Sequence, residues 1–325
     1  MGALARFRPD NFTMALVGTV VFATFLPCSG SFAATWDVAT KLAIALLFFL
    51  HGARLSRQAV IAGLTHWRLH ITVFAFTYAL FPLLGLAAAA LPASVLSPSL
   101  GLGILFLCCL PSTVQSSIAF TSIAGGNVPA AICSASASSI LGVFLTPLLV
   151  GLLMSANGGG VSMDQIYSII MQLLVPFIVG QLVQPFIGAW ALRHKKLLSL
   201  VDRGSILMVV YGAFSEAVIH GLWHQLTPVS TAGMVLINMV LLGIALSLTT
   251  WSSRKLGFNR QDEITIVFCG SKKSLAAGVP MANILFAGHA VGMIVLPLML
   301  FHQIQLMACA VIARRYARAS EQPAE

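Results

Sequence analysis

The chain has 325 residues, of which 58% are hydrophobic and only 8% are charged, and its formal net charge is +9. A water-soluble domain carries about 25% charged residues because its surface faces water. The composition therefore excludes a soluble globular protein. The chain instead contains continuous apolar stretches of about 20 residues, the length that one helix needs to cross a bilayer. Strands of a membrane barrel would alternate apolar and polar residues, so the predicted fold class is an all-α membrane protein.

The apolar stretches predict about ten transmembrane helices. In chain order they cover residues 12–27, 38–55, 68–91, 99–124, 128–154, 165–190, 198–223, 230–251, 263–287 and 290–316. The first 35 residues could also be a secretory signal, because two arginines precede an apolar stretch and small residues. A retained first helix makes the number of helices even, and we therefore keep it in the predicted fold.

Basic residues are distributed unevenly between the two faces of this ten-helix arrangement. Loops rich in lysine and arginine stay in the cytoplasm, so both termini and residues 193–196 are predicted to be cytoplasmic, and residues 157–160 outside. The chain is expected in the plasma (inner) membrane, and its net charge reflects this orientation rather than a nucleic-acid partner. The opposite face receives only Lys41, whereas the basic face receives Arg6, Arg8, Arg54, Arg57, Arg68, Arg193, Lys195, Lys196, Arg203, Arg254, Lys255, Arg260, Arg314, Arg315 and Arg318.

Five helices followed by five more would have opposite orientations, as in transporters built from inverted repeats. We therefore predict a single transmembrane unit, residues 1–325, with a first repeat at 12–154 and an inverted second repeat at 165–316. Weak echoes support this. Gly52 in the second helix has a counterpart in Gly212 of the seventh, and polar segments in the fourth and ninth helices follow these glycines at similar distances.

These polar segments, residues 109–117 and 269–274, predict interruptions in the fourth and ninth helices. Pro111 lacks a backbone donor and clashes with the preceding turn, and Gly270 lies among small hydroxyl residues that favour unwinding. Broken helices at membrane depth occur only where they are buried in protein or line a cavity. Their free ends offer amide and carbonyl groups to a solute or ion. The alternative is a kinked helix whose serines bond to their own backbone.

Among the acidic residues, lysines and arginines, only three lie well inside the predicted helices: Glu216, Lys272 and Lys273. Ionisable groups at that depth are candidates for function. Adjacent lysines point about 100° apart on a helix, so one can face a site while the other packs elsewhere. Glu216 could alternatively be a protonated carboxyl group bonded to a neighbouring helix together with His220. No metal or cofactor is predicted, because the cysteines and histidines lack metal-ligand spacing.

Several shorter polar side chains are further candidates for the site: Asn127, Ser134 and Ser138. The two serines are four residues apart and share one helix face. The alternative for such small residues is close packing between helices.

Five segments together resemble the bile acid:sodium symporter superfamily, and most closely its SBF-like branch. They are residues 48–52, 110–117, 125–127, 141–147 and 270–276. The resemblance implies two inverted five-helix repeats, in which the fourth and ninth helices break and cross within a core domain. This domain would move against a panel of the first, second, sixth and seventh helices. Gly52 and Glu216 would belong to the panel, and Ser116, Ser117, Lys272 and Lys273 to the crossing.

The sequence departs from this family in its ion site. The resemblance implies a sodium-binding glutamate in the ninth helix, where this chain has Phe268, and a serine-asparagine pair where it has Ser116 and Ser117. These departures argue against sodium coupling and leave uniport, exchange and proton coupling open. The resemblance does not identify a bile acid as the substrate of this chain.

The predicted function is secondary transport of a small organic anion across the bilayer by alternating access. The basic pair favours an anion through charge-assisted hydrogen bonds. One alternative is a non-transporting regulatory or scaffold protein built on the same fold. A less favoured one is an intramembrane enzyme, although no nucleophile–base pair or acidic pair has a suitable spacing. The fourth helix would contribute Ser112, Thr113, Gln115, Ser116 and Ser117, and the ninth helix Gly270, Ser271, Lys272, Lys273 and Ser274.

Overall fold

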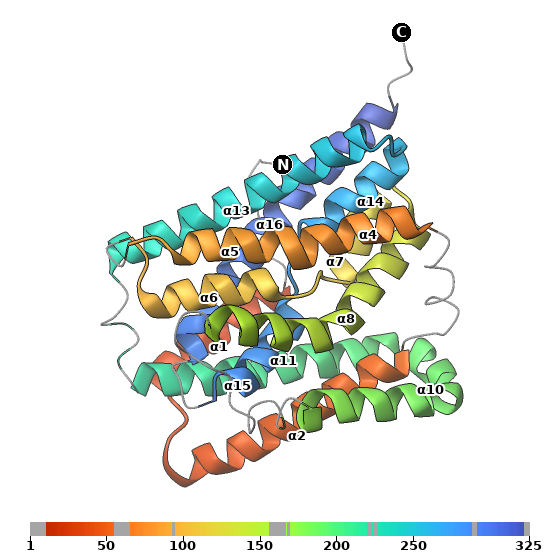
Figure 1. The fold of residues 1–325 in the computed structure, drawn as a ribbon. Helices are drawn as coiled ribbons and strands as arrows, with labels where there is room; N and C mark the ends of the chain where they lie inside the picture. Colours follow the sequence, from red (N-terminus) through yellow and green to blue (C-terminus); the bar gives the residue numbers. More distant parts are fainter. Residues whose placement is uncertain are drawn as a thin grey trace, which may run out of the picture. The chain divides into compact units, whose positions relative to one another are not determined.

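The computed structural model describes residues 11–54, 66–92, 95–155, 167, 170–219, 221, 223, 227–287 and 291–321 (Figure 1). These residues form helices joined by short connections, and no strand occurs among them. The α-helices are α1 (Asn11–Phe25), α2 (Gly30–Arg54), α4 (Trp67–Ala75), α5 (Phe81–Ala89), α6 (Pro98–Cys109), α7 (Gln115–Ile123), α8 (Val128–Ser155), α10 (Val175–Arg193), α11 (Lys195–Ile219), α13 (Pro228–Lys255), α14 (Arg260–Gly270), α15 (Leu275–Leu285) and α16 (Val291–Glu321). Two π-helical turns, η3 (Phe76–Leu80) and η4 (Ile170–Leu174), precede α5 and α10.

Helix length and composition confirm a membrane protein with several spans. Seven helical stretches in the described residues are long and apolar enough to cross a bilayer: Gly30–Arg54, Trp67–Ala89, Val128–Leu153, Met171–Ala191, Lys196–Ile219, Pro228–Lys255 and Val291–Ala319. The other three expected spans are shorter. Helix α1 has 15 residues, and the fourth and ninth are divided into α6 with α7 and α14 with α15. The count of ten and the inverted repeat therefore stay predictions.

The chain divides into two compact units, and each unit takes residues from both halves of the sequence. Unit 1 comprises Met1–Leu55, Ser162–Thr227 and Val279–Val295, and unit 2 comprises Ser56–Val161, Pro228–Gly278 and Leu296–Glu325. Unit 1 contains α1, α2, α10 and α11. These are the four helices that the family resemblance assigns to the panel. The expected connector at residues 157–160 and His220 lie outside the described residues.

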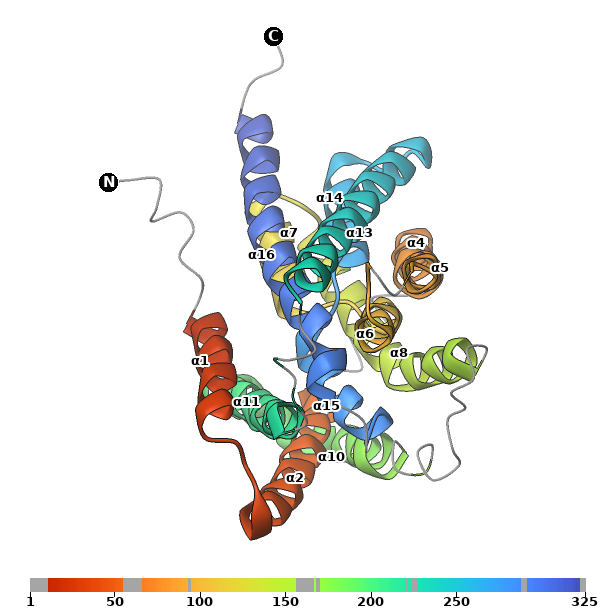
Figure 2. The same cartoon turned by 90° about the vertical axis from the view of Figure 1, so that its left-hand side faces the viewer.

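In unit 1, α2 and α10 lie side by side (Figures 1 and 2). The two helices approach each other through a glycine on each. A Cβ atom on Gly52 would fall on the carbonyl oxygen of Phe177, and one on Gly180 would fall on the carbonyl oxygen of Phe49. Each helix therefore packs on the bare backbone of the other. Small residues allow this close approach between membrane helices.

We expect Gly180→Ala to lower the unfolding temperature of the protein, because its Cβ would meet rigid backbone. Overpacking costs about 1–3 kcal/mol, and backbone yields less than a side chain. Gly204→Ala in α11 of the same unit is the matched control, since no atom outside its own helix turn lies within 4 Å of the new Cβ. Thermal unfolding of both purified variants tests this. Equal unfolding temperatures for the two would contradict the packing described.

Basic residues of unit 1 gather where the ends of three helices meet. The Arg54 guanidinium at the end of α2 binds the Asp202 carboxylate of α11, with Nη1 to Oδ2 at 2.6 Å. Arg203 in α11 lies over the ring of Phe12 at the start of α1, 5.6 Å from its centroid. These contacts join residues that the charge distribution assigns to one face of the membrane.

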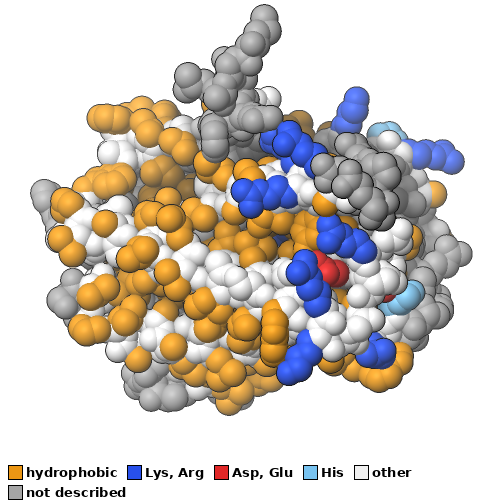
Figure 3. All heavy atoms as spheres, turned by 90° about the horizontal axis from the view of Figure 1, so that it is seen from above, with side chains coloured by type: hydrophobic (Ala, Val, Ile, Leu, Met, Phe, Trp, Pro, Cys, Tyr) orange, Lys and Arg blue, Asp and Glu red, His pale blue; other side chains and the backbone are white. Residues whose placement is uncertain are grey.

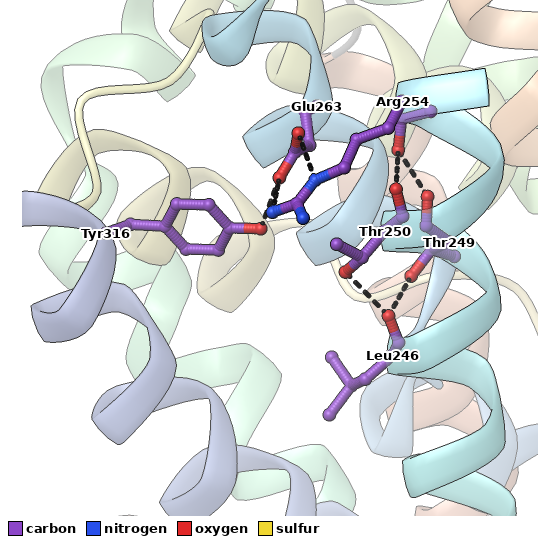
Figure 4. Close-up of polar contacts among 7 residues, drawn as sticks. Leu246, Thr249, Thr250, Arg254, Glu263 and Tyr316 are labelled. Carbon is purple, nitrogen blue, oxygen red and sulfur yellow. Dashed lines mark hydrogen bonds and ion pairs between the residues drawn. The ribbon is translucent and has the colours of Figure 1, made fainter. Parts of the chain in front are cut away.

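Unit 2 has a similar basic end, where α13 ends and α14 begins. Arg254 forms two hydrogen bonds with Glu263, at 3.0 and 3.1 Å, and the Tyr316 hydroxyl donates a third to that carboxylate at 2.8 Å (Figure 4). Arg260 lies over the Tyr316 ring, 4.7 Å from its centroid. Basic side chains accordingly gather on one part of the face in Figure 3, whereas much of that face is hydrophobic.

Candidate substrate site at the crossing of two broken helices

The first break follows from the position of Pro111. Helix α6 ends at Cys109, Leu110 is extended (φ −75°, ψ 155°), and α7 begins only at Gln115. The residue before a proline is disfavoured in the helical region because the proline ring clashes with it. Leu110 therefore leaves the helix, and the last carbonyl groups of α6 lose their helical donors. The predicted interruption of the fourth helix is confirmed.

The second break separates α14 from α15. Helix α14 ends at Gly270, residues 271–274 are not helical, and α15 begins at Leu275. The Ser274 hydroxyl accepts a hydrogen bond from the Ala277 amide at 3.2 Å, which is the side-chain cap that serine provides at a helix start. The predicted interruption of the ninth helix is also confirmed.

The two breaks meet within unit 2, although about 160 residues separate them in the chain. Hydroxyl groups from the first break and from the start of α7 bind the last carbonyl groups of α14. They replace donors that a continuous helix would supply. These contacts are Ser112 Oγ to Cys269 O at 2.6 Å and Ser117 Oγ to Phe268 O at 2.9 Å. The two breaks also meet through their backbones, since the Ser274 amide donates to the Pro111 carbonyl at 2.9 Å.

Lys273 is fully buried in this crossing, and all three hydrogens of its ammonium group have acceptors. Its Nζ donates to the carbonyl oxygens of Thr77, Cys108 and Leu110, each at 2.8 Å. The ring of Phe81 lies on another side, with its centroid 4.2 Å from Nζ. The charge of Lys273 is therefore satisfied by the protein itself.

Gln305 of α16 holds the backbone of the same lysine. Its Oε1 accepts from the Lys273 amide and its Nε2 donates to the Lys273 carbonyl, both at 2.9 Å. Nε2 also lies 3.0 Å from Nδ1 of His302. A single buried side chain thus takes the place of helical hydrogen bonds where the ninth helix is open.

Lys272 is also fully buried, but its environment is different. Its Nζ has no hydrogen-bond partner among the described residues. Instead it lies over two aromatic rings, 4.2 Å from the Phe120 centroid in α7 and 5.3 Å from the Phe268 centroid in α14. The expectation that the two lysines face different surroundings holds. The reason differs, because they lie in the non-helical break and not on a continuous helix.

The remaining candidates near the first break form a local hydroxyl network. Gln115 is exposed and Ser116 is half-buried. In the second break, the Ser271 hydroxyl donates to the Val267 carbonyl of α14 at 2.6 Å, as the alternative of a self-bonded serine predicts. The other contacts are Thr113 Oγ1 to Ser116 Oγ at 2.7 Å and to Ser117 Oγ at 3.2 Å, and the Ser112 amide to Ser138 Oγ at 3.0 Å.

Asn127 and Ser134 bond to other parts of unit 2. Asn127 accepts from the Ala130 amide at the start of α8 and donates to the Asp262 carboxylate at 2.8 Å. Asp262 lies in the first turn of α14, about 12 Å along the helix from its end at the break. Ser134 bonds to His70 Nδ1 at 2.6 Å. These contacts hold α4, α8 and the start of α14 together.

Glu216 lies in α11 of unit 1 and is half-buried. The crossing and both lysines lie in unit 2. Glu216 therefore belongs to unit 1, which contains the four helices that the family resemblance assigns to the panel, and its role in the site stays a prediction.

Sequence analysis did not identify two residues that bind Lys273 at the crossing, Thr77 and Gln305. Thr77 acts through its backbone carbonyl, which leaves no signal in the sequence. Gln305 is a buried amide side chain in an apolar helix. A polar residue within an apolar stretch was the only signal in the sequence that could have identified it. In the part of the chain that the structure describes, no three histidine, cysteine or acidic residues group together as a metal site would require.

Comparisons with known proteins find similar sequences over nearly the whole chain. Residues 10–318 match the model of the SBF-like CPA transporter family. An uncharacterized protein of Pseudomonas aeruginosa is 64% identical, and "Putative symporter YfeH" of Escherichia coli K12 is 56% identical. "Sodium/bile acid cotransporter 7" of Rattus norvegicus is 30% identical. In each case the alignment covers 96% of this chain and 94% of the relative. The chain therefore belongs to the SBF-like CPA transporter family.

Proposed function

We propose that this protein is a secondary transporter for a small organic anion, and that Lys272 supplies the positive charge that recruits it. The observation that carries the proposal is the Nζ of Lys272, which is fully buried where two broken helices cross and has no hydrogen-bond partner in the described part of the chain. A charge in a membrane interior without acceptors is costly. An anionic solute would provide the missing acceptors through charge-assisted hydrogen bonds.

The division into two units supports alternating access as the mechanism. Unit 2 carries the crossing, and unit 1 carries the four helices of the expected panel. In this proposal ten spans form two inverted five-helix repeats, and movement of one unit against the other exposes the crossing to each side of the membrane in turn. The names of two relatives, a symporter and a cotransporter, support transport over a scaffold role or catalysis.

Several features of the crossing favour transport without sodium. Position 268 is phenylalanine, and the acidic residues of α14, Asp262 and Glu263, lie at its opposite end, where they bind Asn127 and Arg254. A sodium ion 4 Å from an ammonium group would be repelled by about 4 kcal/mol at an effective dielectric constant of about 20. A proton or no coupling ion at all fits this charge distribution better.

We therefore expect uptake to persist when sodium is replaced by potassium or choline. The substrate would first be found by screening small carboxylates, sulfonates and phosphates for thermal stabilisation of the purified protein. Uptake of the labelled compound into proteoliposomes would then be measured in each salt. Uptake that collapses without sodium contradicts sodium independence. Stabilisation by an anion without any uptake would favour the scaffold alternative instead.

A further inference from the structure

The three oxygens around the Lys273 ammonium form a cation site made only of backbone carbonyl groups. They come from η3 and from the end of α6, and each lies 2.8 Å from Nζ. No carboxylate takes part in these contacts. Carbonyl oxygens arranged in this way replace the hydration shell of monovalent cations in selective channels. The ring face of Phe81, 4.2 Å from Nζ, adds a further attraction for positive charge.

These carbonyl groups are available because the local backbone cannot satisfy them. In η3 the Phe81 amide bonds to the Phe76 carbonyl, and the next residue, Pro82, has no amide hydrogen to offer Thr77. At the end of α6, the Ser112 amide that a continuous helix would direct to Cys108 donates to Ser138 instead. The same end of α6 also carries the negative pole of the helix dipole.

We propose that the carbonyl groups of Thr77, Cys108 and Leu110 are a monovalent-cation site permanently filled by a tethered cation, the Lys273 ammonium. Truncating that side chain would leave a site for free potassium or a small primary ammonium ion. Divalent ions take oxygen ligands at about 2.0–2.6 Å, shorter than the 2.8 Å contacts here. Sodium, smaller than potassium, fits the spacing less well. The proposal does not depend on anion transport and needs no substrate to be tested.

The test measures thermal unfolding of purified full-length Lys273→Ala at constant ionic strength. n-Propylammonium carries the same heavy atoms that this truncation removes. In choline chloride the variant should unfold below wild type. Potassium and n-propylammonium should then raise its unfolding temperature by about 2–4 °C in a saturable manner, with sodium weaker and magnesium inactive. Wild type should respond to none of them. A Lys273→Ala protein that folds and ignores every cation would overturn the proposal.

Two further variants keep the test decisive. Lys272→Ala removes the same atoms from the neighbouring lysine, whose Nζ has no carbonyl acceptor among the described residues. Only the rings of Phe120 and Phe268 would attract a cation there, so n-propylammonium should stabilise this variant much less than Lys273→Ala. Lys273→Met keeps the length of the side chain without the charge, so it should be destabilised and unresponsive to cations. If Lys273→Met does not fold while Lys272→Met does, the loss of the Lys273 charge destabilises the protein even more strongly, which also supports the proposal. Wild-type stability of Lys273→Met contradicts the proposal even where Lys273→Ala cannot be purified.

Discussion

Replacing Lys272 with methionine is expected to reduce uptake of the anionic substrate by about 100-fold or more, equivalent to about 2.7 kcal/mol. A hydrogen bond to a charged group contributes about 1.5–3 kcal/mol, so the loss of one or two such bonds accounts for this effect. The fold should persist, because the ammonium of Lys272 makes no hydrogen bond with the residues that the structure describes. Methionine can also pack its sulfur against Phe120 and Phe268, a favourable contact with aromatic rings.

The measurement is initial uptake into proteoliposomes, normalised to the amount of folded protein. Lys255→Met is the matched control, because Lys255 is an exposed lysine at the end of α13 that lies over the Trp251 ring, and its uptake should equal wild type. Lys272→Arg should not restore full uptake, since a planar guanidinium fits a compact site differently. Wild-type uptake by Lys272→Met would show that this lysine does not bind the substrate.

Local sequence signals were sufficient to predict the two breaks. A proline such as Pro111 disfavours the helical conformation of the preceding residue in any surroundings. Gly270 lies at the end of an apolar stretch and is followed by polar residues. Because both signals act over a few residues, they do not depend on the rest of the fold. The prediction that the two breaks meet rested on the family resemblance and on the similar positions of the two segments in the two halves of the chain. Contacts such as Ser112 to Cys269 bear it out.

The partners of each polar group were beyond sequence reasoning, because they depend on contacts between distant elements. Lys272 and Lys273 are adjacent and chemically identical, yet one has three carbonyl acceptors and the other has two aromatic rings. Ser134 and Ser138 are four residues apart on one helix, yet Ser134 bonds to His70 whereas Ser138 binds the first break. Burial and hydrophobicity alone do not distinguish these outcomes.

Replacing Gln305 with methionine is expected to destabilise the protein more than any surface change in the same unit. Methionine has a similar length, so the packing of α16 changes little. The amide and carbonyl groups of Lys273 would lose the two bonds that Gln305 provides. An unsatisfied buried polar group costs about 1–3 kcal/mol, and two of them give an expected loss of about 2–6 kcal/mol. Gln261→Met is the control, because Gln261 is exposed in α14, and surface changes usually stay within about 0.5 kcal/mol.

Two measurements on Gln305→Met distinguish this role from general packing. Thermal unfolding should shift down strongly for Gln305→Met and hardly for Gln261→Met. Amide hydrogen exchange should accelerate most at residues 271–274, because the break loses the side chain that holds its backbone, and exchange reports such local opening. Helix α2, which belongs to unit 1, should keep its protection in the folded variant. An unchanged exchange rate at residues 271–274 would show that the break is held by its contacts with Pro111 and Ser112 alone.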